Sequence, residues 1–226
     1  MSVIKINPTV ISKPNIEVFK EINKNTIYKE IQPIYKDQTI YLIGGGPSLK
    51  NFDFNVLKTK NSIAINKAYQ VASFANFLYW SDFRFYQWFK EDIDNFKGFK
   101  VTNKPKPIDD NIINLKDTGK LGIDINPHAL RHGNNSGYAA INLAVHLGVN
   151  KIILLGYDMG SSGNATHFHN GYDTKTDEKV YKNNMLPCFE SLVDELKELK
   201  IEIWNASKDS KLTCFPKCSL LEAINF

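Results

Sequence analysis

A short apolar run that breaks directly into consecutive glycines constrains the fold of this chain most strongly. Residues 39–43 read Thr-Ile-Tyr-Leu-Ile and predict a buried strand. They are followed by Gly44, Gly45, Gly46, Pro47 and Ser48. Glycine permits positive φ and a close backbone approach to a ligand, and Pro47 and Ser48 suit the first turn of a helix, whose N–H groups attract anions. The segment therefore predicts a phosphate-binding turn or, alternatively, a strand-to-helix turn without a ligand. Its spacing matches neither G-x-G-x-x-G nor a P-loop.

The length and composition fit one α/β domain. The chain has 226 residues, of which 42% are hydrophobic and 23% charged. We expect residues 38–226 to form a single domain, and residues 1–37 to form an N-terminal arm with a short helix over 18–28. The formal net charge of +4 comes from lysines spread along the sequence, so we expect no nucleic-acid partner.

We expect a cytoplasmic protein with no transmembrane segment. No stretch approaches about eighteen uninterrupted apolar residues, and the first residues lack the continuous apolar region of a signal peptide. The three cysteines do not make a disulfide framework, which is consistent with a reducing compartment.

Two further apolar runs end in polar residues, as the first one does. Residues 62–65 lead to Asn66, and residues 76–80 lead to Ser81 and Asp82. Ligands of parallel sheets bind beyond the carboxyl ends of the strands, so the glycine turn, Asn66 and Asp82 would face one crevice. Asp82 has a second interpretation, as a turn residue bonded to nearby backbone.

The rest of the chain alternates between predicted helices and strands. Residues 90–131 are poorly patterned, with strand candidates over 99–102 and 112–115, and suggest an insertion or lid. A helix over 137–147, a strand over 151–156, a helix from about Pro187 and a strand over 201–204 follow. The order predicts a Rossmann-like three-layer α/β/α sandwich with a mostly parallel sheet.

Several polar residues of the second half are candidates for a site. The helix over 137–147 opens with Asn135, Ser136 and Gly137, whose N–H groups form a second possible anion site, although Ser136 capping the helix is an equal alternative. Gly156 and Asp158 end the strand over 151–156, and Asp158 could bind a ribose hydroxyl, a metal or a reacting hydroxyl, or serve only in a turn.

His167 and His169 are the candidate catalytic residues. They alternate within a polar loop over 160–172, so an extended segment would place both imidazoles on one side, and either could act as a general acid or base. No nearby cysteine or carboxylate has the spacing of a usual zinc ligand set, so we expect no metal site.

The order of short motifs resembles the MptE-like superfamily. These motifs are Gly-Gly-Gly-Pro-Ser-Leu-Lys over 44–50, Ile-Asn-Lys-Ala-Tyr over 65–69, Ser-Gly-Tyr-Ala-Ala over 136–140, Leu-Gly over 147–148 and Ile-Leu-Leu-Gly-Tyr-Asp over 153–158. With the segments over 203–212 and 219–223, the series is also similar to bacterial lipooligosaccharide sialyltransferases. The resemblance covers residues 38–226.

The resemblance implies a nucleotide-dependent transferase. It implies that glycines 44–46, Pro47, Ser48, Asn66, Ser136, Gly137 and Asp158 line a nucleotide pocket, and that His167 or His169 is the base. MptE-like enzymes transfer pyrophosphate from ATP with magnesium, whereas the sialyltransferases transfer sialic acid from a CMP donor without metal.

Two departures separate these alternatives. Gly45 stands where the sialyltransferases usually have Asn, and residues 65–69 lack the acidic Asp-Gly-Ala of pterin pyrophosphokinases. Asn66 followed by Tyr69 is closer to the sialyltransferase pattern, so the leading expectation is a glycosyltransferase with a CMP-sugar-like donor and a small-molecule or glycan acceptor. The alternatives are a magnesium-dependent pyrophosphokinase and a non-catalytic, phage-encoded nucleotide-binding accessory protein.

Overall fold

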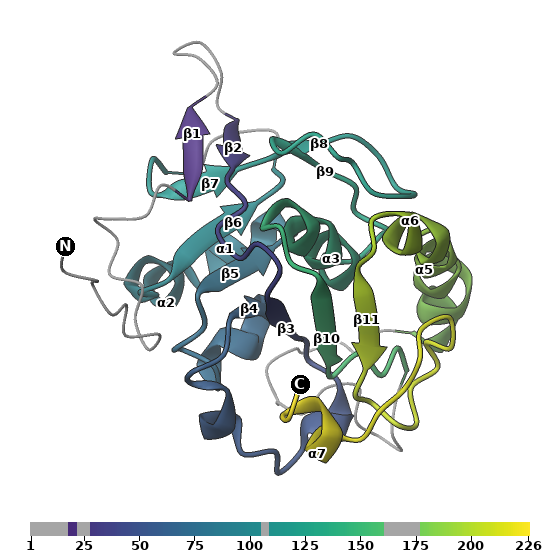
Figure 1. The fold of residues 1–226 in the computed structure, drawn as a ribbon. Coiled ribbons are helices and arrows are strands. Elements are labelled where there is room, and N and C mark those ends of the chain that lie inside the picture. Colours follow the sequence, from purple (N-terminus) through teal and green to yellow (C-terminus); the bar gives the residue numbers. More distant parts are fainter. Residues whose placement is uncertain (1–17, 22–27, 105–108, 161–176) are drawn as a thin grey trace, which may run out of the picture.

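One parallel sheet forms the centre of the molecule. The computed structural model describes residues 18–21, 28–104, 109–160 and 177–226. Within them, seven strands pair side by side, and every neighbouring pair is parallel (Figure 1). Their spatial order is β11 (Glu202–Asn205), β10 (Lys151–Leu155), β3 (Thr39–Ile43), β4 (Ser62–Ile65), β5 (Phe77–Trp80), β6 (Phe99–Thr102) and β7 (Ile112–Asn114).

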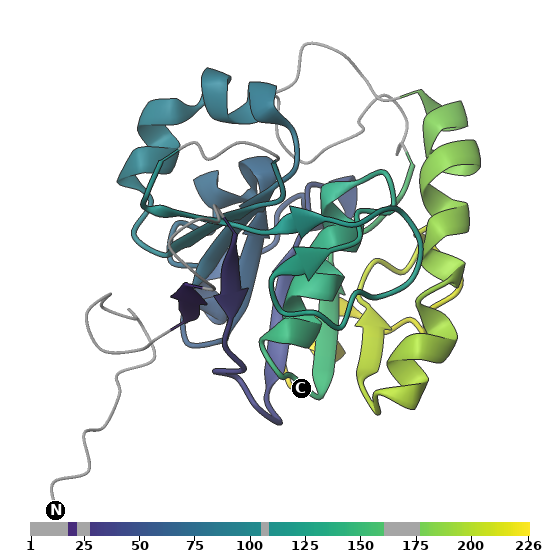
Figure 2. The same ribbon diagram turned by 90° about the horizontal axis from the view of Figure 1, so that it is seen from above.

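Both faces of this sheet are covered, which explains why its strands read as unbroken apolar runs. Every side chain of β4, β5 and β6 is buried. Residues that alternate along β3 join two different cores, with Leu42 in one and Ile43 in the other. Figure 2 shows helices on both sides of the sheet. The predicted three-layer α/β/α fold of the Rossmann-like kind is confirmed.

Different helices cover the two faces of the sheet. The first core contains residues of α3 (Ser136–His146), α5 (Leu186–Glu190) and α6 (Val193–Glu198). The second core contains residues of α1 (Phe83–Trp88), α2 (Lys90–Asn95), α7 (Leu220–Ala223) and the 3₁₀ helices η1 (Pro47–Leu49), η2 (Phe54–Leu57) and η3 (Asn66–Gln70).

The helical segment before β11 begins earlier than predicted. Instead of starting near Pro187, it begins with α4 (Glu178–Val180) and continues through a π-helical turn, η4 (Tyr181–Met185), into α5 and α6. Asp177 caps its start by accepting a hydrogen bond from the N–H of Lys179 at 2.8 Å. Pro187 lies in the first turn of α5, where a proline is tolerated.

The helix predicted over 18–28 is wrong for the residues of that range that the structure describes, because they lie in or beside two strands. The strands β1 (Phe19–Glu21) and β2 (Lys29–Ile31) pair antiparallel and lie beside the β7 edge of the molecule in Figure 1. Gln32 N–H donates to the carbonyl of Val18 at 2.8 Å. Val18 and Ile31 are buried in the first core, which fixes the pair against the domain.

The middle of the chain extends the sheet rather than forming a lid. Its two predicted strands are β6 and β7, and the loop after them carries β8 (Lys116–Asp117) paired with β9 (Ala129–Leu130). Buried Asn142 of α3 fastens this loop, because its Oδ1 accepts the N–H groups of Asp124 at 2.9 Å and Arg131 at 3.1 Å. The expectation of an insertion or lid is therefore wrong for these residues.

The direction in which the chain adds strands to the sheet reverses once, beside β3. From β3 the chain adds β4, β5, β6 and β7 on one side, and then α3 leads back to β10 on the other side. The loops leaving β3 and β10 run to opposite faces at such a point, which opens a crevice at the carboxyl edge of the sheet.

Candidate functional site

A cavity of about 600 Å³ lies at this crevice and brings together most of the predicted site residues. Its lining comes from the loops after β3, β4, β5 and β10, from α1, from the first turn of α3 and from η4. The predicted residues in the lining are Gly44, Gly45, Gly46, Asn66, Asp82, Asn135, Ser136, Gly137, Gly156 and Asp158. Pro47 and Ser48 are not in the lining, since they lie in η1 behind the loop. His167 and His169 lie outside the described residues.

The glycines after β3 are required by close packing and not by backbone conformation. None of Gly44, Gly45 and Gly46 has a positive φ, and the φ of Gly46 is −65°. A Cβ on Gly46 would lie 1.8 Å from Asp158 Oδ2 and 2.5 Å from the carbonyl oxygen of Gly156. Of the two properties of glycine considered for this turn, the structure uses the close approach and not the positive φ. The glycines let the β3 loop touch the β10 loop.

The turn that was expected to hold a phosphate already holds a carboxylate of the protein. Ser48 donates its N–H to Asp158 Oδ1 at 3.0 Å and its hydroxyl to Asp158 Oδ2 at 2.7 Å. Gly44 N–H donates to the carbonyl of Leu155 at 2.8 Å, and Gly46 N–H to that of Gly156 at 2.9 Å. The helix after the loop, η1, is a single three-residue turn. This leaves little of the loop to receive an external anion.

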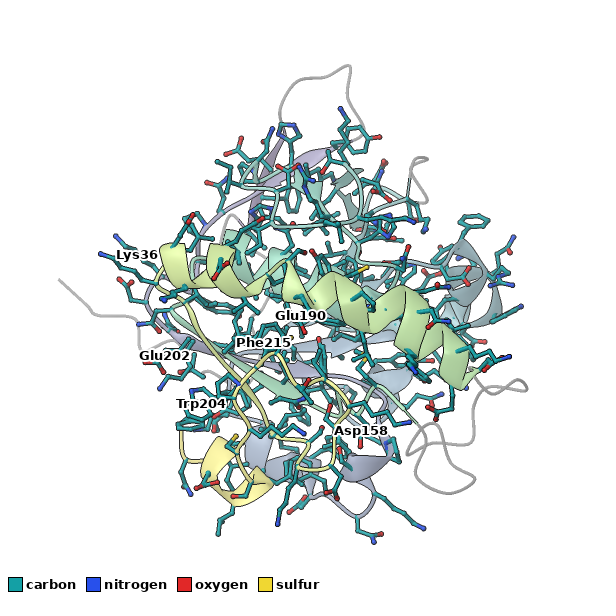
Figure 3. The ribbon with its side chains drawn as sticks, turned by 90° about the vertical axis from the view of Figure 1, so that its right-hand side faces the viewer. Lys36, Asp158, Glu190, Glu202, Trp204 and Phe215 are labelled. Carbon is teal, nitrogen blue, oxygen red and sulfur yellow. The ribbon has the colours of Figure 1, made fainter. Side chains whose placement is uncertain are left out.

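Asp158 is held in a partly buried position at the carboxyl edge. In Figure 3 it lies at the end of the sheet opposite to Glu202, which begins β11. Burial raises the pKa of Asp158, and the hydrogen bonds from Ser48 and Ser207 oppose that rise. Ser207 is itself buried and lies 3.0 Å from the Ser48 hydroxyl. Asp158 therefore links the loops after β3 and β10 through its hydrogen bonds with Ser48.

The first turn of α3 is the better anion site. Asn135, and not Ser136 as predicted, caps the helix, because its Oδ1 accepts the N–H of Tyr138 at 2.8 Å. Ser136 instead donates its hydroxyl to Asn66 Oδ1 at 3.3 Å. Within the described part of the chain, the N–H groups of Ser136 and Gly137 have no hydrogen-bond partner. Both residues line the cavity, so the positive end of the α3 dipole faces it.

Tyr157 fixes the start of α3 over the end of β10. Its buried hydroxyl donates to the carbonyl of Gly137 at 3.0 Å. A Cβ on Gly137 would lie 2.9 Å from the Tyr157 ring, so glycine permits the close approach. Gly156, just before, has a φ of +68°, and Asn66 at the end of β4 has a φ of +51°. Left-handed backbone at both strand ends turns the chain around the cavity.

The wall of the cavity that α1 forms contains Arg84 and Trp88, which the sequence analysis did not select, beside the predicted Asp82. Asp82 caps α1 by accepting the N–H of Arg84 at 2.9 Å, and it forms an ion pair with Arg84 Nη2 at 2.7 Å. The hydrogen bond from Arg84 lowers the pKa of Asp82. Phe85 and Tyr86 are buried, but Trp88 is 61% exposed and lines the cavity with Arg84. The spacing of Arg84 and Trp88, one helical turn apart after a capping aspartate, is the pattern that could have revealed this wall.

The donor set does not favour a magnesium site. Asp82 is paired with a guanidinium, and both oxygens of Asp158 accept hydrogen bonds from Ser48. No group of three or more histidine, cysteine or acidic side chains suited to a metal occurs among the described residues. Magnesium prefers free carboxylate oxygens, so neither aspartate is prepared to bind it.

The fold and the cavity together define an open α/β, Rossmann-like domain with a ligand-sized cavity at its switch point. Comparison with protein-family models, with curated protein sequences and with solved structures found no match. None of the helices within the described ranges is long and apolar enough to cross a membrane.

Proposed function

We propose that this chain is a nucleotide-dependent group transferase, and specifically a glycosyltransferase with a CMP-sugar-like donor. The observation that carries the proposal is the position of the cavity. It lies at the switch point of a parallel sheet, where such folds bind nucleotides, and its wall includes the first turn of α3. The unpartnered N–H groups of Ser136 and Gly137 suit the phosphate of the donor.

The reaction needs a stabilised leaving group and a base. The acceptor hydroxyl oxygen forms a bond to the anomeric carbon while the bond from that carbon to the phosphate oxygen breaks, and the nucleotide leaves with the electron pair. The charge that develops on the phosphate would be stabilised by the N–H groups and the dipole of α3. The resemblance to the sialyltransferases supports His167 or His169 as the base that takes the acceptor proton.

The magnesium-dependent pyrophosphokinase is the weaker alternative on this geometry. It would require a magnesium site near Asp82 or Asp158, and both carboxylates are occupied by Arg84 and Ser48. A metal-independent transfer needs neither of them to be free. Nucleotide binding that persists in excess chelator is therefore expected.

The cap of α3 allows the anion site to be tested separately from the fold. Asn135→Ser and Asn135→Asp both keep a good N-cap residue, so both variants should remain about as stable as the wild type. Asn135→Asp adds a negative charge beside Ser136 and Gly137, so its affinity for CMP, measured by titration calorimetry, should fall about 10-fold or more. Equal CMP affinity in the two variants would place the phosphate elsewhere.

The transfer itself is tested with the histidine variants. His167→Ala or His169→Ala should abolish the release of CMP from a CMP-sugar donor while CMP binding survives. Unchanged turnover in both variants contradicts a histidine base. A wild-type protein that binds CMP but consumes no donor with any acceptor supports the non-catalytic alternative.

A further inference from the structure

Among the described residues, Trp88 is the one large hydrophobic side chain that is both exposed and in the cavity wall. Large exposed apolar side chains elsewhere, such as Phe83 on the same helix, are not in the lining. A tryptophan left 61% exposed in the cavity wall has apolar surface that no part of the described chain covers.

The helix that carries Trp88 is firmly placed. Trp80 of β5 stacks on Tyr86 of α1 with ring centroids 6.1 Å apart and an interplanar angle of 11°. Phe85 is buried beside them, and Asp82 caps the helix. The exposed indole is thus presented by an anchored element, as a stacking surface must be if it is to orient a ligand.

The surroundings of the indole fit an uncharged planar ring. The Arg84 guanidinium lies 5.6 Å from the centre of the Trp88 ring, and its charge is already balanced by Asp82 at 2.7 Å. The wall therefore offers an aromatic surface with hydrogen-bonding groups at its edge and no unpaired charge. Phosphate is better served by the first turn of α3, whose Ser136 contacts Asn66 at the end of β4.

The two walls follow neighbouring strands of the sheet. Asn66 follows β4 and Asp82 follows β5, and neighbouring strands lie about 5 Å apart. A phosphate beside Asn66 and Ser136 would place the ribose over the end of β4 and the base over α1. The part of the cavity toward β10, with Asp158 and Met159, would remain for the transferred group.

We infer that Trp88 is the stacking platform for the nucleobase, which rests on the proposed nucleotide-binding function. Stacking on an aromatic side chain tolerates every base, so Trp88 contributes affinity, and the choice among bases is left to the hydrogen-bonding groups around it. Arg84 holds the indole in place and is a positioning residue.

The test compares Trp88→Ala with Phe83→Ala, an exposed aromatic of the same helix that does not line the cavity. CMP, UMP, AMP and GMP are titrated into each protein by calorimetry, and the unliganded melting temperatures are compared to verify folding. For the tightest monophosphate, Trp88→Ala should bind about 10-fold more weakly than the wild type. Trp88→Phe should keep most of the affinity, and Phe83→Ala should change it less than twofold.

Fluorescence provides an independent readout. Of the three tryptophans, Trp80 is fully buried and Trp204 half-buried on β11, so quenching by a bound nucleotide should come from Trp88 and disappear in Trp88→Phe. Trp88→Ala affinity within twofold of the wild type, or equal losses in Trp88→Ala and Phe83→Ala, would overturn the inference and leave the proposed function standing. A wild-type protein that binds none of the four monophosphates would overturn both.

Discussion

At the scale of single residues, one added methyl group at Gly46 should be costly. Gly46→Ala would place a Cβ 1.8 Å from Asp158 Oδ2, whereas Gly44→Ala would meet its nearest atom, the Gly156 carbonyl oxygen, at 2.8 Å. Overpacking typically costs about 1–3 kcal/mol. We expect a loss near the upper end of this range for Gly46→Ala and near the lower end for Gly44→Ala, measured by urea unfolding.

The same clash predicts a coupling between two residues. Part of the Gly46→Ala penalty comes from the Asp158 side chain and part from the Gly156 carbonyl oxygen, so Gly46→Ala should cost about 1 kcal/mol less in an Asp158→Ala background than in the wild type. Additive free energies of unfolding in this double-mutant cycle would show that the Asp158 side chain does not contribute to the penalty.

At the scale of elements, α3 should make the stability of the protein depend on pH. His146, near the end of α3, is buried and donates from Nε2 to the carbonyl of Ala129 at 2.8 Å. Burial lowers the pKa of His146 below 6.5, although Ala129 and Asp124 oppose this shift. As the pH falls through 6.5, the unfolded chain takes up a proton that the folded chain resists, so the free energy of unfolding should decrease.

The expected slope from this one histidine is at most about 1.4 kcal/mol per pH unit. His146→Gln retains an N–H that can reach Ala129 but does not titrate. Urea unfolding between pH 7 and pH 5 should therefore show a smaller loss of stability in His146→Gln than in the wild type. Parallel curves for the two proteins would mean that His146 is equally protonated in the folded and unfolded states.

At the scale of the whole molecule, a ligand in the cavity should stabilise the entire fold, because residues from four strand ends and α3 line it. A nucleotide that binds only the folded state contributes about 2.7 kcal/mol at 100 times its Kd. For a single domain of this size, that corresponds to a rise in Tm of about 5–10 °C. A thermal-shift series with CMP, with and without magnesium, should give the same rise, and a rise only with ATP and magnesium would favour the pyrophosphokinase.

The sequence predicts the architecture well because the apolar runs that identify the strands are local features of the sequence. Apolar runs such as residues 39–43 and 151–156 have one stable use in a doubly covered sheet, and both form central strands. The prediction of a helix over 18–28 was wrong because strand pairing and the burial of Val18 and Ile31 override a weak helical periodicity of the apolar residues. One helix boundary also differs from the prediction, since the helical segment before β11 begins at Glu178 and not near Pro187.

The site is predicted less well because it depends on contacts between distant residues. The glycines were correctly selected as a place of close approach, but what approaches is Asp158, which is 110 positions from Ser48 in the sequence. Likewise, Asn135 rather than Ser136 caps α3, since Ser136 bonds to Asn66 across the cavity. Trp88 was missed because it lies in a run of aromatic residues of which Phe85 and Tyr86 are buried.

The central place of β3 has a consequence for synthesis on the ribosome. This strand leaves the exit tunnel early, yet its partner β10 is synthesised more than a hundred residues later. Until then, one edge of β3 is an open template carrying Ile40, Tyr41, Leu42 and Ile43, all buried in the finished fold. Pairing at this edge is therefore late, and a chain stalled before β10 would be prone to aggregate.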